Sequence, residues 1–382
     1  MHAAYKVADV LNLEVDHLQD IAHTSWNARG LHAIRKCRTK ALGGHLDWCM
    51  KCNKLHLRFN SCRNRHCPTC QGHKQRQWIA ARSQELLAVP YFHVVFTLPD
   101  SLDPVALRHP QVLYGILFDT AWATLSAFGK NPEHLGAKLG MIAVLRTWGQ
   151  NLQLHPHLHC IVPKGGVSKA GFWKKGKGKD DFLFSVKALS DKYRGLFVAK
   201  LRKAIPELPQ SLYDKLFKKK WAVYAKPPFG RPEHVIEYLG RYTHKIAISN
   251  HRILNIDKEK REVTFSLKDY RKGGQRTTMT LTSKEFIRRF QLHILPKGFT
   301  RIRHYGFLSS SWKKERLPLL QLQLAEKDLL HIETPVTTDK SLHRVCPSCK
   351  KGELITLLTF DSRGPPKNYR KTIKRKLLKF RL

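Results

Sequence analysis

Acidic residues are scarce in this chain of 382 residues, in which 29 Asp and Glu stand against 69 Lys and Arg and leave a formal charge of +40. A folded protein with such an excess needs a polyanion to offset it, and nucleic acid is the favoured partner because each phosphate contact releases a counterion. Two alternatives are less favoured: a positive charge that serves only solubility, and binding to anionic lipid. The basic residues run through the whole chain, which favours a long nucleic-acid-binding surface.

Long apolar segments are also missing. Residues 1–20 contain no apolar core of the signal-peptide type, and no later segment is expected to reach membrane-spanning length. These absences predict a cytoplasmic protein with no membrane partner. Internal repeats are not found either, so we expect ordinary globular domains, two or three for a chain of this length.

The cysteines number only nine, and most of them lie in short pairs. Cys49 and Cys52 form one CxxC pair, Cys67 and Cys70 form another, and fourteen residues separate the two pairs. In a reducing compartment such pairs favour zinc over disulfides, since each CxxC turn presents two thiolates to one tetrahedral ion. The spacing therefore predicts one zinc site made by these four thiolates, and a chance group of four buried thiols is the less favoured alternative.

Further potential zinc ligands surround these pairs: Cys37, His45, Cys62 and His66. A second zinc ion bound by some of them stays open, with ordinary buried thiols at Cys37 and Cys62 as the alternative. The same segment is rich in Lys and Arg, which predicts a DNA-binding module. We expect Arg63 and Arg65 to be among its DNA contacts.

A later CxxC pair, Cys346 and Cys349, has no matching pair downstream. His343 or His331 could complete a metal site there. The alternatives are a relic zinc knuckle or a pair of surface thiols, and the sequence does not decide between them.

Apolar periodicity and turn residues divide the chain into helices and strands. Helices are expected at 1–36, 71–88, most of 103–139, 190–204 and after the capping-box pair Thr282 and Glu285. Strands are expected at 91–98, 141–148, 155–162, 221–224, 246–249, 252–256, 262–268 and 276–281. Residues 164–180 are rich in Gly and Lys and are predicted to form an exposed loop or hairpin, and 364–382 form a basic tail.

The segment HPHLHC at 155–160 predicts a metal site on a strand. Side chains alternate along a strand, so His157 and His159 share one face while Leu158 and Cys160 pack into a core. Two imidazoles spaced about 6–7 Å apart along the backbone can converge on one ion. A satisfied core histidine is the alternative for either residue, and we prefer the metal site.

Tyr238 and Tyr242 are four residues apart, which places both phenol groups on one face of a helix. The spacing alone is weak, because aromatic residues at this interval usually belong to a core. Gly240 between them costs about 1 kcal/mol relative to alanine in a helix. That cost indicates a close approach by DNA or by another backbone.

These motifs, taken in order, resemble the HUH-type two-tyrosine transposases of bacterial insertion sequences, which move by a rolling-circle-like route. The resemblance covers nearly the whole chain through the motifs at 61–71, 96–99, 147–159, 221–230, 238–253 and 286–306. It implies an α+β fold in which an HUH endonuclease domain, an antiparallel sheet with flanking helices of the ferredoxin/RRM-like kind, follows a small zinc-binding domain. The expected division is a helical, zinc-binding DNA-recognition domain at 1–88, a catalytic domain at 89–310 and a C-terminal region at 311–382.

The resemblance also implies the chemistry of the site. His157 and His159 would hold a divalent ion, Mg²⁺ or Mn²⁺, and Tyr238 and Tyr242 would attack single-stranded DNA to form a 5′-phosphotyrosyl link. Its DNA partners would be the hairpin ends of its own element and a target DNA, which associates the protein with the bacterial nucleoid. Zinc, one ion or two, would belong to the N-terminal domain.

The third ligand of the catalytic metal stays open among three residues: Gln150, His234 and His93. Gln150 lies just before the histidine strand, and His234 lies one helical turn before Tyr238, so these two are preferred over His93 on the first strand. Lys226 and Arg241 are candidates for phosphate contacts, with ordinary solvated charges as the alternative.

Two other functions compete with that of a transposase. A rolling-circle replication initiator or a conjugative relaxase shares the same chemistry, but the zinc module and the short chain without a helicase domain favour the transposase. A non-catalytic zinc-binding DNA regulator would keep the basic charge and the cysteine pairs. It would not need the histidine strand or the tyrosine pair.

Overall fold

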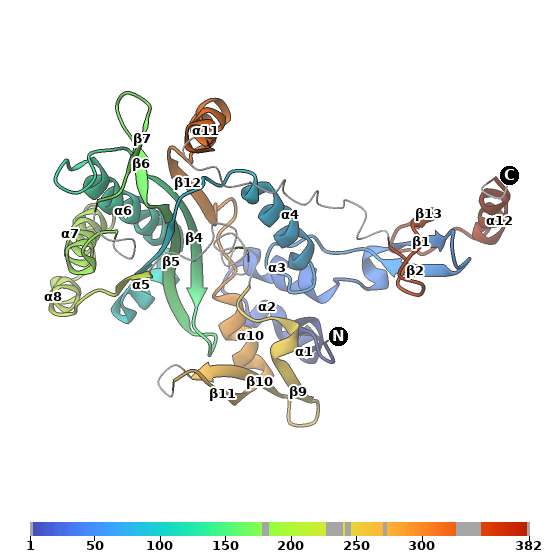
Figure 1. Cartoon of the computed structure of the whole chain (residues 1–382). Coiled ribbons are helices and arrows are strands. Elements are labelled where there is room, and N and C mark those ends of the chain that lie inside the picture. The colour runs from blue at the N-terminus through green and yellow to red at the C-terminus, as the bar shows by residue number, and fades with distance from the viewer. Residues whose placement is uncertain are drawn as a thin grey trace.

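The computed structural model describes residues 3–177, 183–226, 240, 246–269, 273–325 and 345–379, without the side chains of 72–76. Helices and antiparallel sheets alternate along these ranges, which confirms the expected α+β class. Three packed units are visible in Figure 1: a five-stranded sheet with its helices, a smaller sheet packed on the N-terminal helices, and a narrow arm that carries the C-terminal helix.

The five-stranded sheet has the strand order β12-β4-β5-β3-β8, and every neighbouring pair is antiparallel. Its strands are β3 (Tyr91–Thr97), β4 (Gly140–Trp148), β5 (Leu154–Pro163), β8 (Val223–Lys226) and β12 (Ile302–Gly306). β4 and β5 form a hairpin whose register shifts between Arg146 and Trp148. The predicted strands at 91–98, 141–148, 155–162 and 221–224 are confirmed, and the histidine strand β5 lies at the centre of the sheet.

Four helices cover one face of this sheet: α5 (Asp103–Arg108), α6 (Pro110–Lys130), α7 (Val186–Ala204) and α8 (Gln210–Lys218). They bury the alternate apolar residues of the strands, among them Phe96, Leu145, Leu158 and Cys160. Apolar burial of this kind is worth about 25 cal/mol per Å², so the large aromatic and aliphatic set here dominates the stability of the unit.

By length and composition alone, helix α6 could span a membrane. This differs from the expectation that no segment reaches membrane-spanning length. More than half of its apolar window is buried, however, and residues such as Leu117, Phe118 and Leu125 lie in the core against the sheet. These contacts are those of a core helix in a globular domain.

The opposite face of the sheet is only partly covered. Its outer part packs on the end of α4 (Gln71–Ser83) and on α11 (Ser310–Ala325), and a hairpin of β6 (Gly165–Val167) and β7 (Trp173–Lys175) lies beside them. A hairpin was expected at 164–180 and is present, but its first strand is buried rather than exposed as predicted. The part of the face around the β5 histidines carries basic and imidazole side chains instead of an apolar core.

The second unit combines the N-terminal helices with a segment that lies between β8 and β12 in the sequence. It consists of α1 (Val7–Leu13), α2 (Leu18–Ile21), α3 (Ser25–Arg35), β9 (Ile253–Asp257), β10 (Glu262–Asp269), β11 (Gln275–Thr282) and α10 (Ser283–Gln291). The Thr282 hydroxyl accepts from the Glu285 backbone N–H at 3.3 Å and caps α10 as predicted, while the Glu285 carboxylate pairs with Arg288 and Arg289. The predicted strand at 246–249 is wrong, because this segment is irregular although mostly buried.

The third unit is the arm, a sheet of order β13-β1-β2 made by β1 (Gly44–Cys49), β2 (Leu55–Phe59) and β13 (Leu354–Phe360). Helix α12 (Tyr369–Lys379) packs on β13 through Ile373, which meets Trp48 and Leu357. Strands from the N-terminal and C-terminal parts of the chain therefore share one sheet, while the N-terminus itself lies at α1 in the second unit (Figure 1). The domain boundaries at 88 and 310 stay predictions, and contacts between described residues cross both of them.

Candidate catalytic face and cysteine clusters

The histidines of β5 lie on the open face of the central sheet. The ring centroids of His155 and His157 are 4.9 Å apart, and those of His157 and His159 are also 4.9 Å apart. The intervening Leu158 and Cys160 are fully buried in the core on the other face. The predicted alternation along the strand is therefore confirmed, whereas metal binding by the two histidines stays a prediction.

Hydrogen bonds determine which nitrogen of each ring carries the proton. The Nδ1 of His157 contacts the backbone oxygen of His155, which can only accept, so this Nδ1 is protonated and Nε2 holds the lone pair. The Nε2 of His159 lies 3.3 Å from Nη1 of Arg146, which can only donate, so His159 also presents a lone pair at Nε2. His159 then donates through Nδ1 to Nε2 of His93 at 2.8 Å.

Burial keeps these imidazoles neutral. It lowers the pKa of His157 to about 3 and the pKa of His93 to about 4, with the charge of Arg146 adding to the effect at His157 and that of Lys226 at His93. The pKa of His159 is also lowered well below its ordinary value, mainly by burial. Neutral imidazole is the form that binds metals. The N–H of the second ring nitrogen, which donates to a neighbouring acceptor, orients such a ligand.

The donor set at His157 and His159 therefore fits a divalent ion, with one condition. The Arg146 guanidinium lies at the lone pair of His159, where an ion would bind, so metal binding requires this side chain to move aside. Arg146 is held nearby by stacking on Trp148, with 5.2 Å between the guanidinium carbon and the ring centroid.

The candidates for a third ligand differ in position. Gln150 lies in the turn between β4 and β5, where its backbone oxygen accepts from Arg252 at 2.6 Å. His234 lies outside the described residues. His93, the less favoured candidate, lies on β3 in direct hydrogen-bond contact with His159, and the two rings stack at 5.0 Å.

Tyr238, Tyr242 and Arg241 also lie outside the described residues, but Gly240 between them is described. Gly240 is helical and packs on Ile79 of α4: a Cβ at this position would lie 2.3 Å from Cγ1 of Ile79. The sequence predicted a close approach by DNA or by a backbone at this glycine, whereas the structure shows the side chain of Ile79 there. Gly240 therefore rests on the helix that leads out of the first cysteine cluster.

Replacing Gly240 by alanine is expected to destabilise this contact by about 1–3 kcal/mol, because the new methyl group overpacks Ile79. An Ile79→Ala change makes room, so the double variant should lose less stability than the sum of the two single variants. Thermal unfolding of the four proteins measures the coupling. Strictly additive losses would contradict the contact.

Lys226 is exposed on β8, in register with His93 across the β3–β8 pair. Its position on the face of the histidines suits the phosphate contact predicted for it, which stays a prediction. Together with Arg146 it makes this face cationic.

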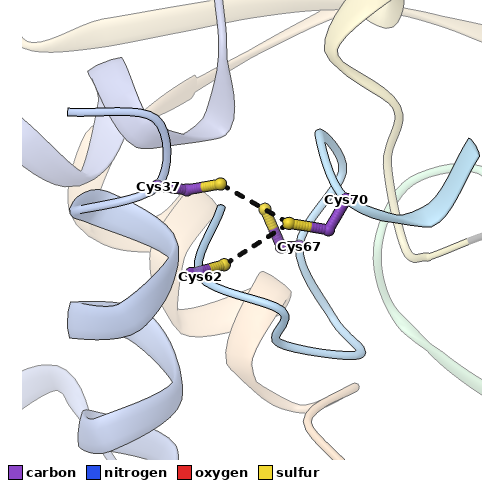
Figure 2. Close-up of side chains that lie close together, drawn as sticks. All are labelled: Cys37, Cys62, Cys67 and Cys70. Atoms are coloured by element: carbon purple, nitrogen blue, oxygen red, sulfur yellow. Dashed lines mark hydrogen bonds between the residues drawn. The ribbon is translucent and has the colours of Figure 1, made fainter. Parts of the chain in front are cut away.

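Figure 2 shows the first cysteine cluster, in which Cys37, Cys62, Cys67 and Cys70 converge. The Sγ atom of Cys70 lies 3.5 Å from that of Cys37 and 3.7 Å from that of Cys62. A tetrahedral zinc ion with bonds of about 2.3 Å needs sulfur atoms about 3.8 Å apart, so these four thiolates fit the ion. The cluster joins the end of α3 to the start of α4, and Cys37 and Cys67 belong to the core of the second unit.

The predicted grouping of cysteines is wrong. Cys49 and Cys52 do not share a site with Cys67 and Cys70, because β1 is an extended strand of six residues that rises about 3.3 Å per residue and carries Cys49 away from Cys37. The first cluster instead takes Cys37 and Cys62, two of the residues left open by the sequence. Cys49 and Cys52 meet Cys346 and Cys349 at the far end of the arm.

The predicted histidine ligands His45 and His66 belong to neither cluster. Nε2 of His66 accepts from the backbone N–H of Leu295 at 3.1 Å, which uses the lone pair that a metal would need. Nε2 of His45 lies 3.4 Å from the Asp47 carboxylate. Both histidines are therefore structural, and the site uses thiolates alone.

Arg65 is also structural. Its guanidinium donates to the backbone oxygens of Phe299 at 2.6 Å and Pro296 at 2.8 Å, and these bonds replace the DNA contact predicted for it. Arg63 is exposed, with a φ of +53°, and remains a candidate for DNA binding.

The two arginines are expected to behave differently as alanine variants. Arg65→Ala should destabilise the fold by about 2–3 kcal/mol, since it leaves buried carbonyls without a charged donor. Arg63→Ala should leave the unfolding temperature unchanged and reduce the salt dependence of single-stranded DNA binding by about 0.7 in the slope of log K against log salt. Thermal unfolding measures the stability of the two variants, and binding constants over a series of salt concentrations measure the slope. An equal loss of stability in the two variants would contradict these roles.

Comparison with known proteins agrees with these features. Residues 12–98 match the family described as "Transposase zinc-binding domain", and residues 140–316 match the family described as "Putative transposase". The chain is 41% identical to "Putative transposase y4qJ" of Sinorhizobium fredii over 95% of this chain and 97% of that protein. It is 28% identical to "Transposase for insertion sequence element IS801" of Pseudomonas savastanoi over 80% of this chain and 74% of that protein.

No solved structure was found to match the chain. The matched regions contain both halves of the geometry described above: the first cysteine cluster lies within 12–98, and the β5 histidines lie within 140–316. The chain belongs to the family of IS91-type transposases, DNA-processing enzymes of insertion sequences that carry an N-terminal zinc-binding domain.

Proposed function

We propose that this transposase nicks and rejoins single-stranded DNA at the ends of its element through a 5′-phosphotyrosine intermediate, with a divalent ion at His157 and His159. The supporting observation is the pair of buried, neutral imidazoles that present Nε2 lone pairs on the cationic face of the sheet that α5 to α8 do not cover. Mg²⁺ or Mn²⁺ bound there would polarise the scissile phosphate as a Lewis acid.

The phenol oxygen of Tyr238 or Tyr242 is the proposed nucleophile. Its attack forms a bond to phosphorus as the bond to the 3′-oxygen breaks; the phenol loses a proton, and the departing 3′-oxygen gains one. The phosphodiester energy is kept in the phosphotyrosine, so a 3′-OH from another strand can reverse the step and join without ATP. Arg146 and Lys226 provide positive charge for the phosphates on this face.

Two tyrosines permit two linked cleavages, one that starts strand transfer and one that completes it. The proposed substrates are the hairpin ends of the element and a single-stranded target DNA. The formal charge of +40 supports a polyanionic substrate along much of the surface. Chromosomal DNA as the substrate places the reaction at the nucleoid.

His93 is proposed to orient His159 through the hydrogen bond between them. Loss of such an outer partner costs about 10–100-fold in metal affinity. His93→Ala should therefore weaken Mn²⁺ binding by that factor, and His93→Gln, which keeps an acceptor, should recover part of it. Titration calorimetry with Mn²⁺ measures the change, and an unchanged affinity in His93→Ala would rule out the orienting role.

A cleavage assay tests the proposed function as a whole. Labelled single strands that carry the element ends are incubated with the full-length protein and Mg²⁺ or Mn²⁺, then analysed under denaturing conditions. We expect metal-dependent cleavage and a labelled species that migrates with the protein. Binding without cleavage would contradict the proposed chemistry, and cleavage of the strands without a protein-bound product would point to a different nuclease mechanism.

A further inference from the structure

Two CxxC pairs that are remote in sequence converge in the arm: Cys52 and Cys346 are 294 positions apart along the chain. The Sγ atoms of Cys52 and Cys346 are 3.6 Å apart, and those of Cys49 and Cys349 are 3.7 Å apart. All four ligand atoms lie within 4.8 Å of one another. These spacings match the edge of about 3.8 Å expected for four sulfurs around one zinc ion.

The two CxxC turns are close copies of each other. In the first, the N–H of Asn53 donates to the oxygen of Cys49 at 2.9 Å, and Asn53 has a φ of +57°. In the second, the N–H of Lys350 donates to the oxygen of Cys346 at 2.9 Å, and Lys350 has a φ of +56°. A left-handed residue follows each second cysteine directly; Asn adopts this conformation readily whereas Lys rarely does, so the shared turn at Lys350 indicates a shared constraint.

Several groups around the sulfurs donate hydrogen bonds of the kind that thiolate ligands receive. The N–H of Cys52 lies 3.5 Å from Sγ of Cys49, and the N–H of Gly352 lies 3.3 Å from Sγ of Cys349. Nε2 of His56 lies 3.3 Å from Sγ of Cys346. Such outer contacts orient ligands and stabilise their negative charge.

Gly352 shows how closely the second turn approaches the first. A Cβ at this position would lie 2.4 Å from Sγ of Cys49, so only glycine brings the two pairs together. The register of β1 and β13 places Cys49 opposite Leu354, which holds Gly352 beside the sulfurs.

We propose that Cys49, Cys52, Cys346 and Cys349 bind a second zinc ion. This ion closes a zinc ribbon formed by one N-terminal and one C-terminal segment of the chain. The apolar core of the arm is small, with Trp48, Leu357 and Ile373 as its buried members. A unit of this size needs a metal or another cross-link to be stable, so the ion supplies folding free energy to the arm.

The ion also determines where the basic C-terminal helix lies. Helix α12 carries six Lys and Arg residues in eleven and no acidic residue, and it packs on β13. Closure of the ribbon therefore fixes this charge on the arm, which β1 and β2 connect to the first cysteine cluster. The second zinc site joins segments that are remote in sequence into one basic arm.

Zinc analysis of the full-length protein tests the proposal. We expect two zinc ions per chain in the unaltered protein and one in the Cys346→Ser/Cys349→Ser variant. Ser348→Ala, which changes the same turn without touching a ligand, and Cys160→Ala, which removes the cysteine outside both clusters, should each retain two. Two ions in the Cys346→Ser/Cys349→Ser variant, or one in the unaltered protein, would overturn the proposal.

Alkylation of the unaltered protein gives a readout that does not depend on the folding of a variant. Cys346 and Cys349 should resist iodoacetamide together with Cys49 and Cys52, and all four should become reactive after chelation. Peptide mapping by mass spectrometry follows each thiol. Rapid labelling of Cys346 and Cys349 while Cys49 and Cys52 stay protected would show that the pairs do not share an ion.

Discussion

Replacing His157 or His159 by alanine is expected to reduce cleavage of single-stranded element ends by about 1,000-fold or more. Each change removes an Nε2 lone pair from the proposed metal site, and Lewis-acid stabilisation of the transition state is worth several kcal/mol. About 4 kcal/mol corresponds to a factor of about 1,000 in rate. Single-turnover cleavage rates at saturating Mn²⁺ measure the loss.

His155→Ala is the matched control for this prediction. His155 lies on the same strand and the same face, two residues before His157, and contacts it through its backbone oxygen, which alanine keeps. It is exposed, whereas His157 and His159 are buried. Its variant should cleave within a few-fold of the unaltered protein, and a loss equal to that of His157→Ala would contradict a specific metal site.

The Tyr238→Phe/Tyr242→Phe variant is expected to form no covalent complex with DNA, and each single change should impair strand transfer. Phenylalanine preserves the ring and its packing but lacks the oxygen that attacks phosphorus. A suicide substrate with a nick after the scissile phosphate traps the complex, and a denaturing gel measures it.

Tyr224→Phe provides the control for the tyrosine pair. Tyr224 is 52% exposed on β8, two residues before Lys226 and therefore on the same face of the sheet, but it is not one of the two proposed nucleophiles. It should retain the complex. A complex that persists in the Tyr238→Phe/Tyr242→Phe variant would remove both residues from the nucleophilic role.

Local patterns in the sequence predicted much of the catalytic unit. Alternation along 155–162 predicted that His157 and His159 share a face, and periodicity predicted most of the individual strands and helices. The antiparallel arrangement of the sheet was implied by the resemblance to the transposase family. The Thr282 cap was predictable because it involves only neighbouring residues, whereas the partner of Gly240, Ile79, lies far away in the sequence and was not.

Contacts between remote segments were not predictable in the same way. The pairing of β1 with β13 and the bond between His93 and His159 depend on sheet order, which no local spacing encodes. The cysteine grouping failed for this reason: the CxxC pairs nearest in sequence belong to different sites. The partners of Cys346 and Cys349 lie upstream, in the first pair of the chain, where a search downstream could not find them.

Mass spectrometry of the trapped protein–DNA complex, after digestion with trypsin and nuclease, tests the proposed chemistry most directly. We expect a nucleotide joined through its 5′-phosphate to Tyr238 or Tyr242, and a free 3′-OH on the released strand. DNA ends with no attached peptide, or an attachment to any other residue, would contradict the phosphotyrosine mechanism.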